Sequence, residues 1–302
     1  MSQPHTPAPE IRTSPLHRTF GVEVQDVDLR QATQTVLYPA LRDLFERHSL
    51  LLFRNQHLDN DEHLAFSQLI GPIEDRSNLR MDGAPKVSHN VSNEDGEGGV
   101  LSEGDAHLLN LKSNMLWHTD STFLPTPALA NVLQARIVPS EGGATEFAST
   151  RAGFRALDPA LQERLRALTF RHRYSHSRAR IDPELAKLAK FAMWPDQEWR
   201  AVWKNPVTGE EALYIASHVF EVIGIPAAEG AALVDGLIEA MTVPDAVYAH
   251  AWQPGDVVVW DERAVLHRGT PWPYDQARTL VSCCISATAA DGLDRMRPVA
   301  AA

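Results

Sequence analysis

Apolar residues recur along the chain with periods that predict both strands and helices. Residues 22–29 roughly alternate between Val or Leu and polar side chains, a pattern typical of a half-buried strand. Apolar residues then follow at helical spacing at 36–45, and the continuous apolar run at 50–53 predicts a buried strand. The chain therefore starts with a strand, a helix and a second strand.

Three more helices are indicated by residues that begin or end helices. Asp59 precedes an amphipathic segment at 60–69, which the Gly71-Pro72 pair ends. Asp158-Pro159 opens a third helix, because proline is favoured in the first turn. A fourth helix is predicted at 226–241.

The second half of the chain consists mainly of short apolar runs between turn residues. Such runs predict strands at 129–138, 248–252, 257–260 and 280–285. The sequence has no internal repeat and no linker rich in Pro, Gly or Ser. We therefore expect one domain at 16–302, mainly β with flanking helices, after a flexible lead-in at 1–15.

Residues 74–114 are rich in Gly, Asp, Asn and Ser, which predicts a long loop. Loops of this length inside a domain are usually functional or disordered. This one leads into a segment with candidate chemistry, so two interpretations stay open. It is either a lid over an active site or a disordered surface loop.

Charge and composition exclude some classes of function. The formal net charge of -11 argues against broad nucleic-acid binding, which depends on Lys and Arg, but not against a small anionic substrate. No run of about 18 apolar residues is present to span a membrane, and the N-terminus lacks the apolar core of a signal peptide. Cys283 and Cys284 are adjacent, which disfavours a disulfide between them. Reduced cysteines favour a cytoplasmic location.

The candidate chemistry centres on His118 and Asp120, two residues apart in Trp117-His118-Thr119-Asp120. An extended backbone would place both side chains on one face, where they can share a metal ion. His267, after the strand predicted at 257–260, is the candidate third ligand. Two imidazoles and one carboxylate leave three positions open on iron(II), enough for a chelating oxo-acid and O2.

Two other interpretations fit the same three residues. A zinc hydrolase would use the same ligands, and a non-catalytic, cupin-like binding protein would keep them as a vestigial site. Arg278 favours the oxygenase, because a buried guanidinium there can pair with the distal carboxylate of 2-oxoglutarate. Thr145 offers a hydroxyl to the same anion. A hydrolase has no use for either residue.

Several stretches together make the chain resemble the taurine dioxygenase and 2,4-dichlorophenoxyacetate dioxygenase family of iron(II)/2-oxoglutarate enzymes. The resemblance runs from Gly21 to about Arg295. The stretches that carry it are 22–29, 51–54, 66–71, 117–123, Gly142-Gly143-Ala144-Thr145-Glu146-Phe147, 255–261 and His267-Arg268-Gly269.

This resemblance implies a double-stranded β-helix, or jelly-roll, with the metal at its mouth. It implies that His118, Asp120 and His267 bind Fe(II), that Thr145 and Arg278 bind 2-oxoglutarate, and that O2 is consumed. The expected reaction hydroxylates a small-molecule substrate, with ether, C–S or sulfate-ester cleavage as an outcome, and yields succinate and CO2. Chlorination is not expected, because related halogenases have a small residue in place of Asp120. The family favours a homo-oligomer, a dimer or tetramer.

One position departs from the family. A second arginine, four residues after the first, commonly holds the acidic group of the substrate, and here that position is Ser282. A serine cannot form the charge-assisted pair that a taurine sulfonate or a phenoxyacetate carboxylate favours, so we expect neither to be the substrate. Either the substrate is neutral and held largely by apolar walls, or polar residues of the long loop are the alternative contacts, together with Ser282 itself. They are Arg80, Asn90, Ser92, Asn93, His107 and Lys112.

Overall fold

The computed structural model describes residues 11–75, 88–102 and 104–298. Its largest sheet has the strand order β1-β2-β3-β13-β5-β15-β4, in which only the β2–β3 pair is parallel. The strands of this sheet are β1 (Thr13–Pro15), β2 (Val22–Val24), β3 (Leu50–Phe53), β4 (His89–Ser92), β5 (Ala128–Ile137), β13 (Val257–Asp261) and β15 (Thr279–Ser286).

A second, three-stranded sheet has the order β12-β6-β14 and is antiparallel throughout. It consists of β6 (Thr145–Ser149), β12 (Val247–His250) and β14 (Val265–Gly269). Leu50 and Leu52 of β3 belong to one hydrophobic cluster with Phe147 of β6, which joins the two sheets. Leu51 and Phe53 point the other way, into a cluster with the helices. The period of two along a strand thus explains why β3 is apolar at every position.

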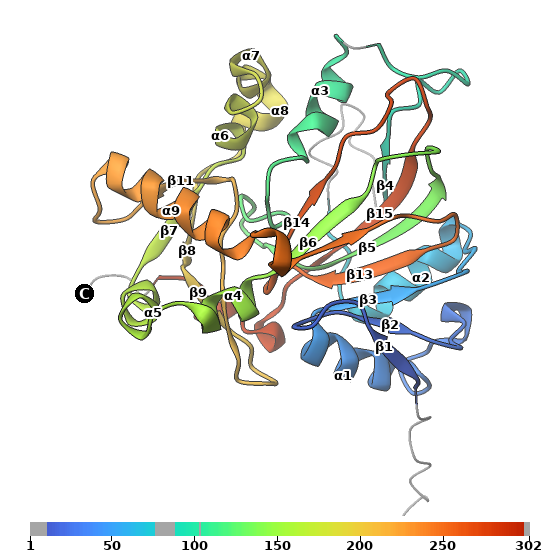
Figure 1. Ribbon diagram of the computed structural model, residues 1–302, viewed down its shortest axis with the longest axis horizontal. Coiled ribbons are helices and arrows are strands. Elements are labelled where there is room, and N and C mark those ends of the chain that lie inside the picture. Colours follow the sequence, from blue (N-terminus) through green and yellow to red (C-terminus); the bar gives the residue numbers. More distant parts are fainter. Residues whose placement is uncertain (1–10, 76–87, 103, 299–302) are drawn as a thin grey trace, which may run out of the picture.

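Two helices cover the outer face of the large sheet: α1 (Tyr38–His48) packs on β3 and β13, and α2 (Asn60–Ile70) packs on β5 and β15 (Figure 1). Helix α2 starts where predicted. The side chain of Asp59 accepts a hydrogen bond from the backbone N–H of Glu62, whose own side chain accepts from the N–H of Asp59.

The other end of the molecule has its own hydrophobic core (Figure 1). The elements at this end are α4 (Thr150–Ala156), α5 (Pro159–Arg166), α9 (Ala227–Met241), β7 (Thr169–His172), β8 (Gln197–Arg200), β9 (Val202–Lys204), β10 (Glu211–Leu213) and β11 (Val219–Val222). Four short helices remain: α3 (Ala106–Ser113), α6 (Tyr174–Ala179), α7 (Pro183–Lys187) and α8 (Ala189–Ala192). Single 3-10 turns lie at Leu29–Gln31, Pro244–Ala246, Ala289–Asp291 and Leu293–Arg295.

Most predicted elements are confirmed, and three differ. The strand expected at 22–29 ends at Val24, because Asp26 has a left-handed backbone (φ 56°) that a strand cannot continue through. Within the lead-in expected at 1–15, Thr13–Pro15 form a strand that pairs with β2, and residues 1–10 lie outside the described chain. The expected loop at 74–114 contains β4 and α3 in its described part.

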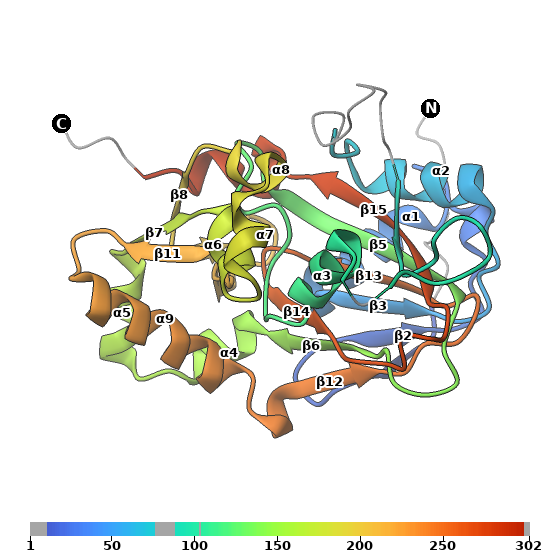
Figure 2. The same ribbon diagram turned by 90° about the horizontal axis from the view of Figure 1, so that it is seen from above.

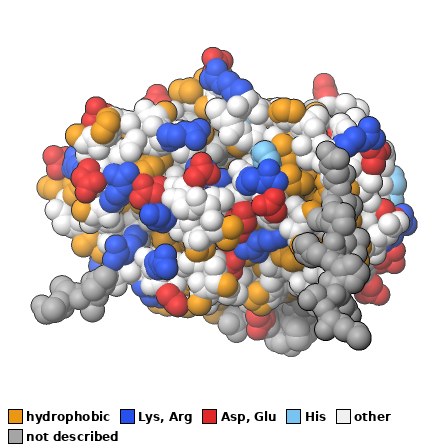
Figure 3. Space-filling view, turned by 90° about the horizontal axis from the view of Figure 1, so that it is seen from below, with side chains coloured by type: hydrophobic (Ala, Val, Ile, Leu, Met, Phe, Trp, Pro, Cys, Tyr) orange, Lys and Arg blue, Asp and Glu red, His pale blue; other side chains and the backbone are white. Residues whose placement is uncertain are grey.

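The surface carries both signs of charge in close mixture. On the face seen in Figure 3, Lys and Arg side chains alternate with Asp and Glu side chains. Ion pairs are common among the described residues, and Arg171, for example, pairs with both Glu198 and Glu221. None of the helices in the described part of the chain combines the length and apolar character that a membrane-crossing helix needs. The two cysteines are buried and form no disulfide with each other.

Candidate metal centre and active-site cavity

A pair of backbone hydrogen bonds brings the two candidate imidazole ligands together. The N–H of His118 donates to the carbonyl of His267 (3.0 Å), and the N–H of His267 donates to the carbonyl of His118 (2.9 Å). The two rings consequently lie with their centroids 4.2 Å apart. The extended segment expected around His118 is thus a single bridge to β14. The chain turns at Asp120 and Ser121, where Ser121 has φ 58°.

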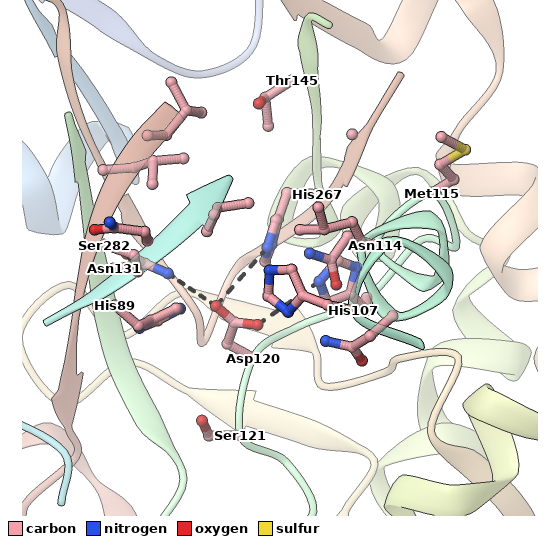
Figure 4. A pocket seen from close by; sticks show the side chains of 18 of the residues that line it. His89, His107, Asn114, Met115, Asp120, Ser121, Asn131, Thr145, His267 and Ser282 are labelled. Atoms are coloured by element: carbon pink, nitrogen blue, oxygen red, sulfur yellow. Dashed lines mark hydrogen bonds and ion pairs between the residues drawn. The ribbon is translucent and has the colours of Figure 1, made fainter. Parts of the chain in front are cut away.

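The carboxylate of Asp120 completes the group (Figure 4). Its oxygens lie 3.6 Å from Nε2 of His118 and 3.9 Å from Nε2 of His267. One ligand atom from each residue falls within 4.8 Å of the other two. Two nitrogens and one oxygen in this arrangement suit a divalent metal ion with open positions on one side.

The protonation of the imidazoles fits a metal ligand set. Nδ1 of His118 lies 2.7 Å from the carbonyl of Leu116 and must carry the hydrogen, because a carbonyl only accepts. Its Nε2 therefore has a free lone pair on the side of Asp120. Burial lowers the pKa of His118 and lowers that of His267 to about 3, so both rings are neutral. Neutral imidazole is the form that binds metals.

Glu262 lies directly behind the group and is fully buried. One carboxyl oxygen accepts a hydrogen bond from the backbone N–H of Asp120 (2.9 Å) and lies 3.8 Å from Nδ1 of His267. Burial, followed by the nearby charge of Asp120, raises the pKa of Glu262 well above its ordinary value. This shift favours the neutral form of Glu262, and the hydrogen bond that it accepts fixes the backbone of Asp120.

Ser282 acts on Asp120 indirectly, through a hydrogen bond to Asn131. The Asn131 amide N–H donates to Oδ2 of Asp120 (2.9 Å), as Figure 4 shows, and the Asn131 amide oxygen accepts from the Ser282 hydroxyl (2.8 Å). Ser282 lines the cavity, but its hydrogen is committed to Asn131, so it is a poor substrate contact. We did not predict Asn131 from the sequence. The signal was its position, a polar residue in the buried apolar strand β5.

Arg278 and Thr145 also lie together in the cavity. Gly142 and Gly143 both have left-handed φ, and a Cβ on Gly143 would stand 3.0 Å from Nε of Arg278. The glycine thus lets Nε of Arg278 donate to the Gly143 carbonyl (3.0 Å). The Thr145 hydroxyl accepts from the Trp252 indole (2.9 Å), which leaves its own hydrogen to be donated.

Arg278 is an anion site in electrostatic terms. It is 5% exposed, and among the described residues no carboxylate pairs with it. Burial without a counter-ion lowers its pKa to about 10. Burying this cation without a counter-ion costs free energy of folding, and a bound anionic ligand would offset that cost.

These groups line one cavity of about 310 Å³, within the range of small-molecule sites. Strands β4, β5, β6, β14 and β15 form one side of it. Helices α3, α6 and α8 contribute the other. The helical side includes Arg178, Tyr174 and Phe191, none of which we singled out from the sequence.

The candidate substrate contacts divide into two groups. Asn90 and His107 line the cavity, and Asn90 is exposed at its edge. Ser92 does not line it, because its hydroxyl is bonded to Thr279 (2.7 Å) and accepts from the N–H of Glu94. Lys112 is also absent from the lining, with its Nζ 5.0 Å above the ring of Tyr274.

Two further loop candidates have other positions. Asn93 is buried, and its side chain accepts from the Arg278 N–H and donates to the carbonyls of Tyr274 and Gln276, so it orders the backbone around Arg278. Arg80 lies outside the described residues.

Comparison with known proteins agrees with this site. Residues 12–284 match the family described as "Taurine catabolism dioxygenase TauD, TfdA family". An alpha-ketoglutarate-dependent 2,4-dichlorophenoxyacetate dioxygenase from Cupriavidus pinatubonensis is 34% identical, over 89% of this chain and 96% of that protein. An (S)-phenoxypropionate/alpha-ketoglutarate-dioxygenase from Sphingobium herbicidovorans is 33% identical, over 90% and 94%.

Among solved structures, the crystal structure of AAD-2 with Mn(II) and N-oxalylglycine superposes with a TM-score of 0.86 at 29% identity, over 92% of this chain and 98% of that one. Alpha-ketoglutarate and 2-oxoglutarate are the same compound. The predicted class, an iron(II)- and 2-oxoglutarate-dependent dioxygenase, is confirmed, and the chain belongs to the TauD, TfdA family.

Proposed function

We propose that this enzyme hydroxylates a small organic substrate at a site built from His118, Asp120 and His267. The observation that carries the proposal is the convergence of these three side chains, with their ligand atoms within 4.8 Å of one another, in a cavity that also contains the unpaired Arg278. When bound, iron(II) and 2-oxoglutarate supply activation of O2, coupled to oxidative decarboxylation of the oxo-acid to succinate and CO2.

In this proposal, Nε2 of each histidine and the Asp120 carboxylate hold the metal. The hydrogen bond that Nδ1–H of His118 donates to the Leu116 carbonyl, and the one that the Asn131 amide donates to Asp120, keep the ligands oriented before the metal arrives. Such outer contacts raise ligand basicity and fix ring orientation. The donor set, two neutral nitrogens and one carboxylate, fits iron(II).

We assign the distal carboxylate of 2-oxoglutarate to Arg278 and Thr145. The arginine supplies a charge-assisted, two-pronged contact, and the threonine hydroxyl donates a further hydrogen bond. Both side chains are buried, 5% and 4% exposed, so these contacts are formed away from water. The low polarity of the surroundings strengthens each of them.

We also propose that the core is a double-stranded β-helix. Support comes from the hydrophobic cluster that joins β3, β5, β13 and β15 of the large sheet to β6 and β14 of the small one. The cavity lies where these two sheets meet the short helices. We further expect a cytoplasmic homodimer or homotetramer.

The favoured reaction is hydroxylation of a C–H bond next to an ether or sulfate-ester oxygen. Relatives are named for a phenoxyacetate, a phenoxypropionate and a sulfate ester, the last at 28% identity. A hydroxyl placed on that carbon gives an unstable product that releases an alcohol or sulfate. The carboxylate of Asp120 occupies the place that a halogenase leaves to chloride, so we expect no chlorinated product.

The test is succinate formation from 2-oxoglutarate by protein loaded with iron(II) without oxygen and then exposed to O2. We expect succinate that depends on iron, and we expect His118→Ala to abolish it, because one ligand is lost. Arg155→Ala is the matched control, since that side chain is exposed and remote from the cavity. Succinate formation at an equal rate by His118→Ala would contradict the assigned ligand set.

A further inference from the structure

A second buried arginine lines the cavity from the helical side. Arg178, on α6, is 6% exposed. Two of its N–H groups donate, one to the hydroxyl of Ser177 (3.0 Å) and one to that of Tyr174 (3.1 Å). Its Nε–H has no acceptor, and no carboxylate among the described residues forms an ion pair with it. A guanidinium has five N–H donors, so several are available to a ligand.

The surrounding side chains hold Arg178 in place but do not neutralise it. Its guanidinium carbon lies 4.2 Å from the ring centroid of Tyr174 and 5.4 Å from that of Phe191. Stacking and two neutral hydroxyl acceptors compensate only part of the cost of burying the charge. Tyr174 accepts from Arg178, and its own hydroxyl hydrogen is then left for a neighbouring acceptor. The arrangement is that of an anion-binding pair.

Arg178 and Arg278 are held by different parts of the fold. Arg278 precedes β15 and donates to Gly143, two residues before Thr145. Arg178 belongs to α6, which in Figure 2 stands on the other side of α3 from β15. It lies near the metal group: the ring of Tyr174, on which it stacks, has its centroid 5.8 Å from that of His218, and the ring of His218 lies 6.3 Å from that of His118. Among the described residues, the cavity lining thus has two buried cationic positions on different elements, besides the exposed Lys190.

We propose that Arg178, assisted by the Tyr174 hydroxyl, binds the anionic head group of the primary substrate. This inference rests on the proposed function, which assigns Arg278 to 2-oxoglutarate. The substrate class is a small organic anion with an apolar body, since Phe123, Leu111 and Met115 also line the cavity. Ser282 therefore does not exclude acidic substrates, because the charge lacking on β15 is supplied by α6.

The first experiment compares matched anionic and neutral probes: phenoxyacetate, hexyl sulfate and phenoxyacetamide. Substrate-stimulated succinate formation gives kcat/KM for each probe. We expect the wild type to prefer an anion over the amide, and Arg178→Gln to reduce that preference roughly 100-fold. The ratio is an internal control, since a misfolded variant loses activity towards all probes. Phenoxyacetate and hexyl sulfate distinguish a carboxylate from a sulfate as the preferred head group.

Two more variants sharpen the result. Arg178→Lys keeps the charge and should retain part of the preference. Arg180→Gln should behave as the wild type, because Arg180 is exposed, pairs with Asp235 and does not line the cavity. An unchanged anion preference in Arg178→Gln overturns the inference, and so does a wild type that no anion stimulates although it forms succinate from 2-oxoglutarate alone.

A binding measurement separates this inference from the proposed function. Calorimetric titration of phenoxyacetate and hexyl sulfate into metal-free protein requires no turnover. If the wild type forms no succinate under any condition, the proposed function fails. Anion binding that Arg178→Gln weakens roughly 100-fold would still support the role of Arg178. Binding that is equal in both proteins would refute it.

Discussion

The two sides of the cavity are built in different ways. On the strand side, the register of the sheets fixes each functional residue: His267 pairs with Phe147, Gly269 with Thr145, and Asn131 with Cys284. On the other side, α3, α6 and α8 are only eight, six and four residues long, and they contact one another and α7. Helices this short are stabilised by their packing, not by their own hydrogen bonds.

This difference suggests a division of roles. The candidate metal and 2-oxoglutarate contacts, which every member of the reaction class needs, lie on or beside paired strands. Arg178, which we assign to the substrate, lies on the short helices, where a change of sequence does not disturb a sheet. Residues that select a ligand are commonly carried on variable segments over a rigid scaffold. Substitutions on the two sides should therefore affect different kinetic constants.

The largest expected effect is that of Arg278→Gln. Loss of the charge-assisted contact should raise KM for 2-oxoglutarate roughly 100-fold. Steady-state succinate formation at varied 2-oxoglutarate measures it. The decisive comparison is between KM for 2-oxoglutarate and KM for the primary substrate, because Arg178→Gln should raise the second and not the first. If both variants raised KM for 2-oxoglutarate equally, the division of the cavity would be wrong.

The next effect is that of Asn131→Ala. Asp120 loses the amide that orients its Oδ2, and iron(II) binding should weaken by about 30-fold, within the range of outer contacts to metal ligands. Competition with a coloured chelator under nitrogen measures the affinity. Gln134→Ala is a control on the same strand, because its amide donates to backbone carbonyls at Gln56 and Leu58, away from Asp120. Equal losses in both variants would indicate a general effect on the strand.

A third effect concerns stability on the strand side in acid. His63 of α2 is fully buried, and burial lowers its pKa to about 4. Because the folded pKa lies below the unfolded value, its contribution to stability is complete above pH 6.5 and is lost as the pH falls towards 4. Between pH 7 and 5.5 the loss should be about 1 kcal/mol. Urea unfolding at both pH values measures it, and His63→Leu should remove this part of the pH dependence.

The smallest effect is expected for Ser282→Ala. The serine orients Asn131 and contacts Asp120 only through it, so iron(II) affinity should fall about threefold, near the lower end of a neutral hydrogen bond. The preference for anionic over neutral probes should stay that of the wild type. A loss of that preference would indicate that Ser282 of β15, and not Arg178, binds the anionic head group of the substrate.

The sequence predicted the strand side better than the helical side. Strands β5, β13 and β15 appear as apolar runs because both of their faces are buried, and His118, Asp120, His267, Thr145 and Arg278 belong to recognisable stretches near them. Asn131 was overlooked because its role depends on which residue of β15 lies beside it. That register is a property of the folded sheet.

The helical side of the cavity could not be predicted in the same way. Helices α6 to α8 are too short to show a hydrophobic period, so nothing in the sequence marked Tyr174 or Arg178 as residues of the cavity. Arg178 looks like a surface arginine in the sequence, since nothing local indicates that Tyr174 and Phe191 bury it. The prediction of a continuous loop at 74–114 missed β4 for a similar reason, because β4 forms only by pairing with β15.

The reciprocal backbone bonds between His118 and His267 have a consequence for assembly. The two residues come from distant parts of the chain, so their rings meet only after β14 has joined β6. A metal ion that needs both rings binds the completed fold alone, and it should raise the unfolding temperature as a ligand of the native state does. Bound iron would then mark those molecules in which the fold is complete.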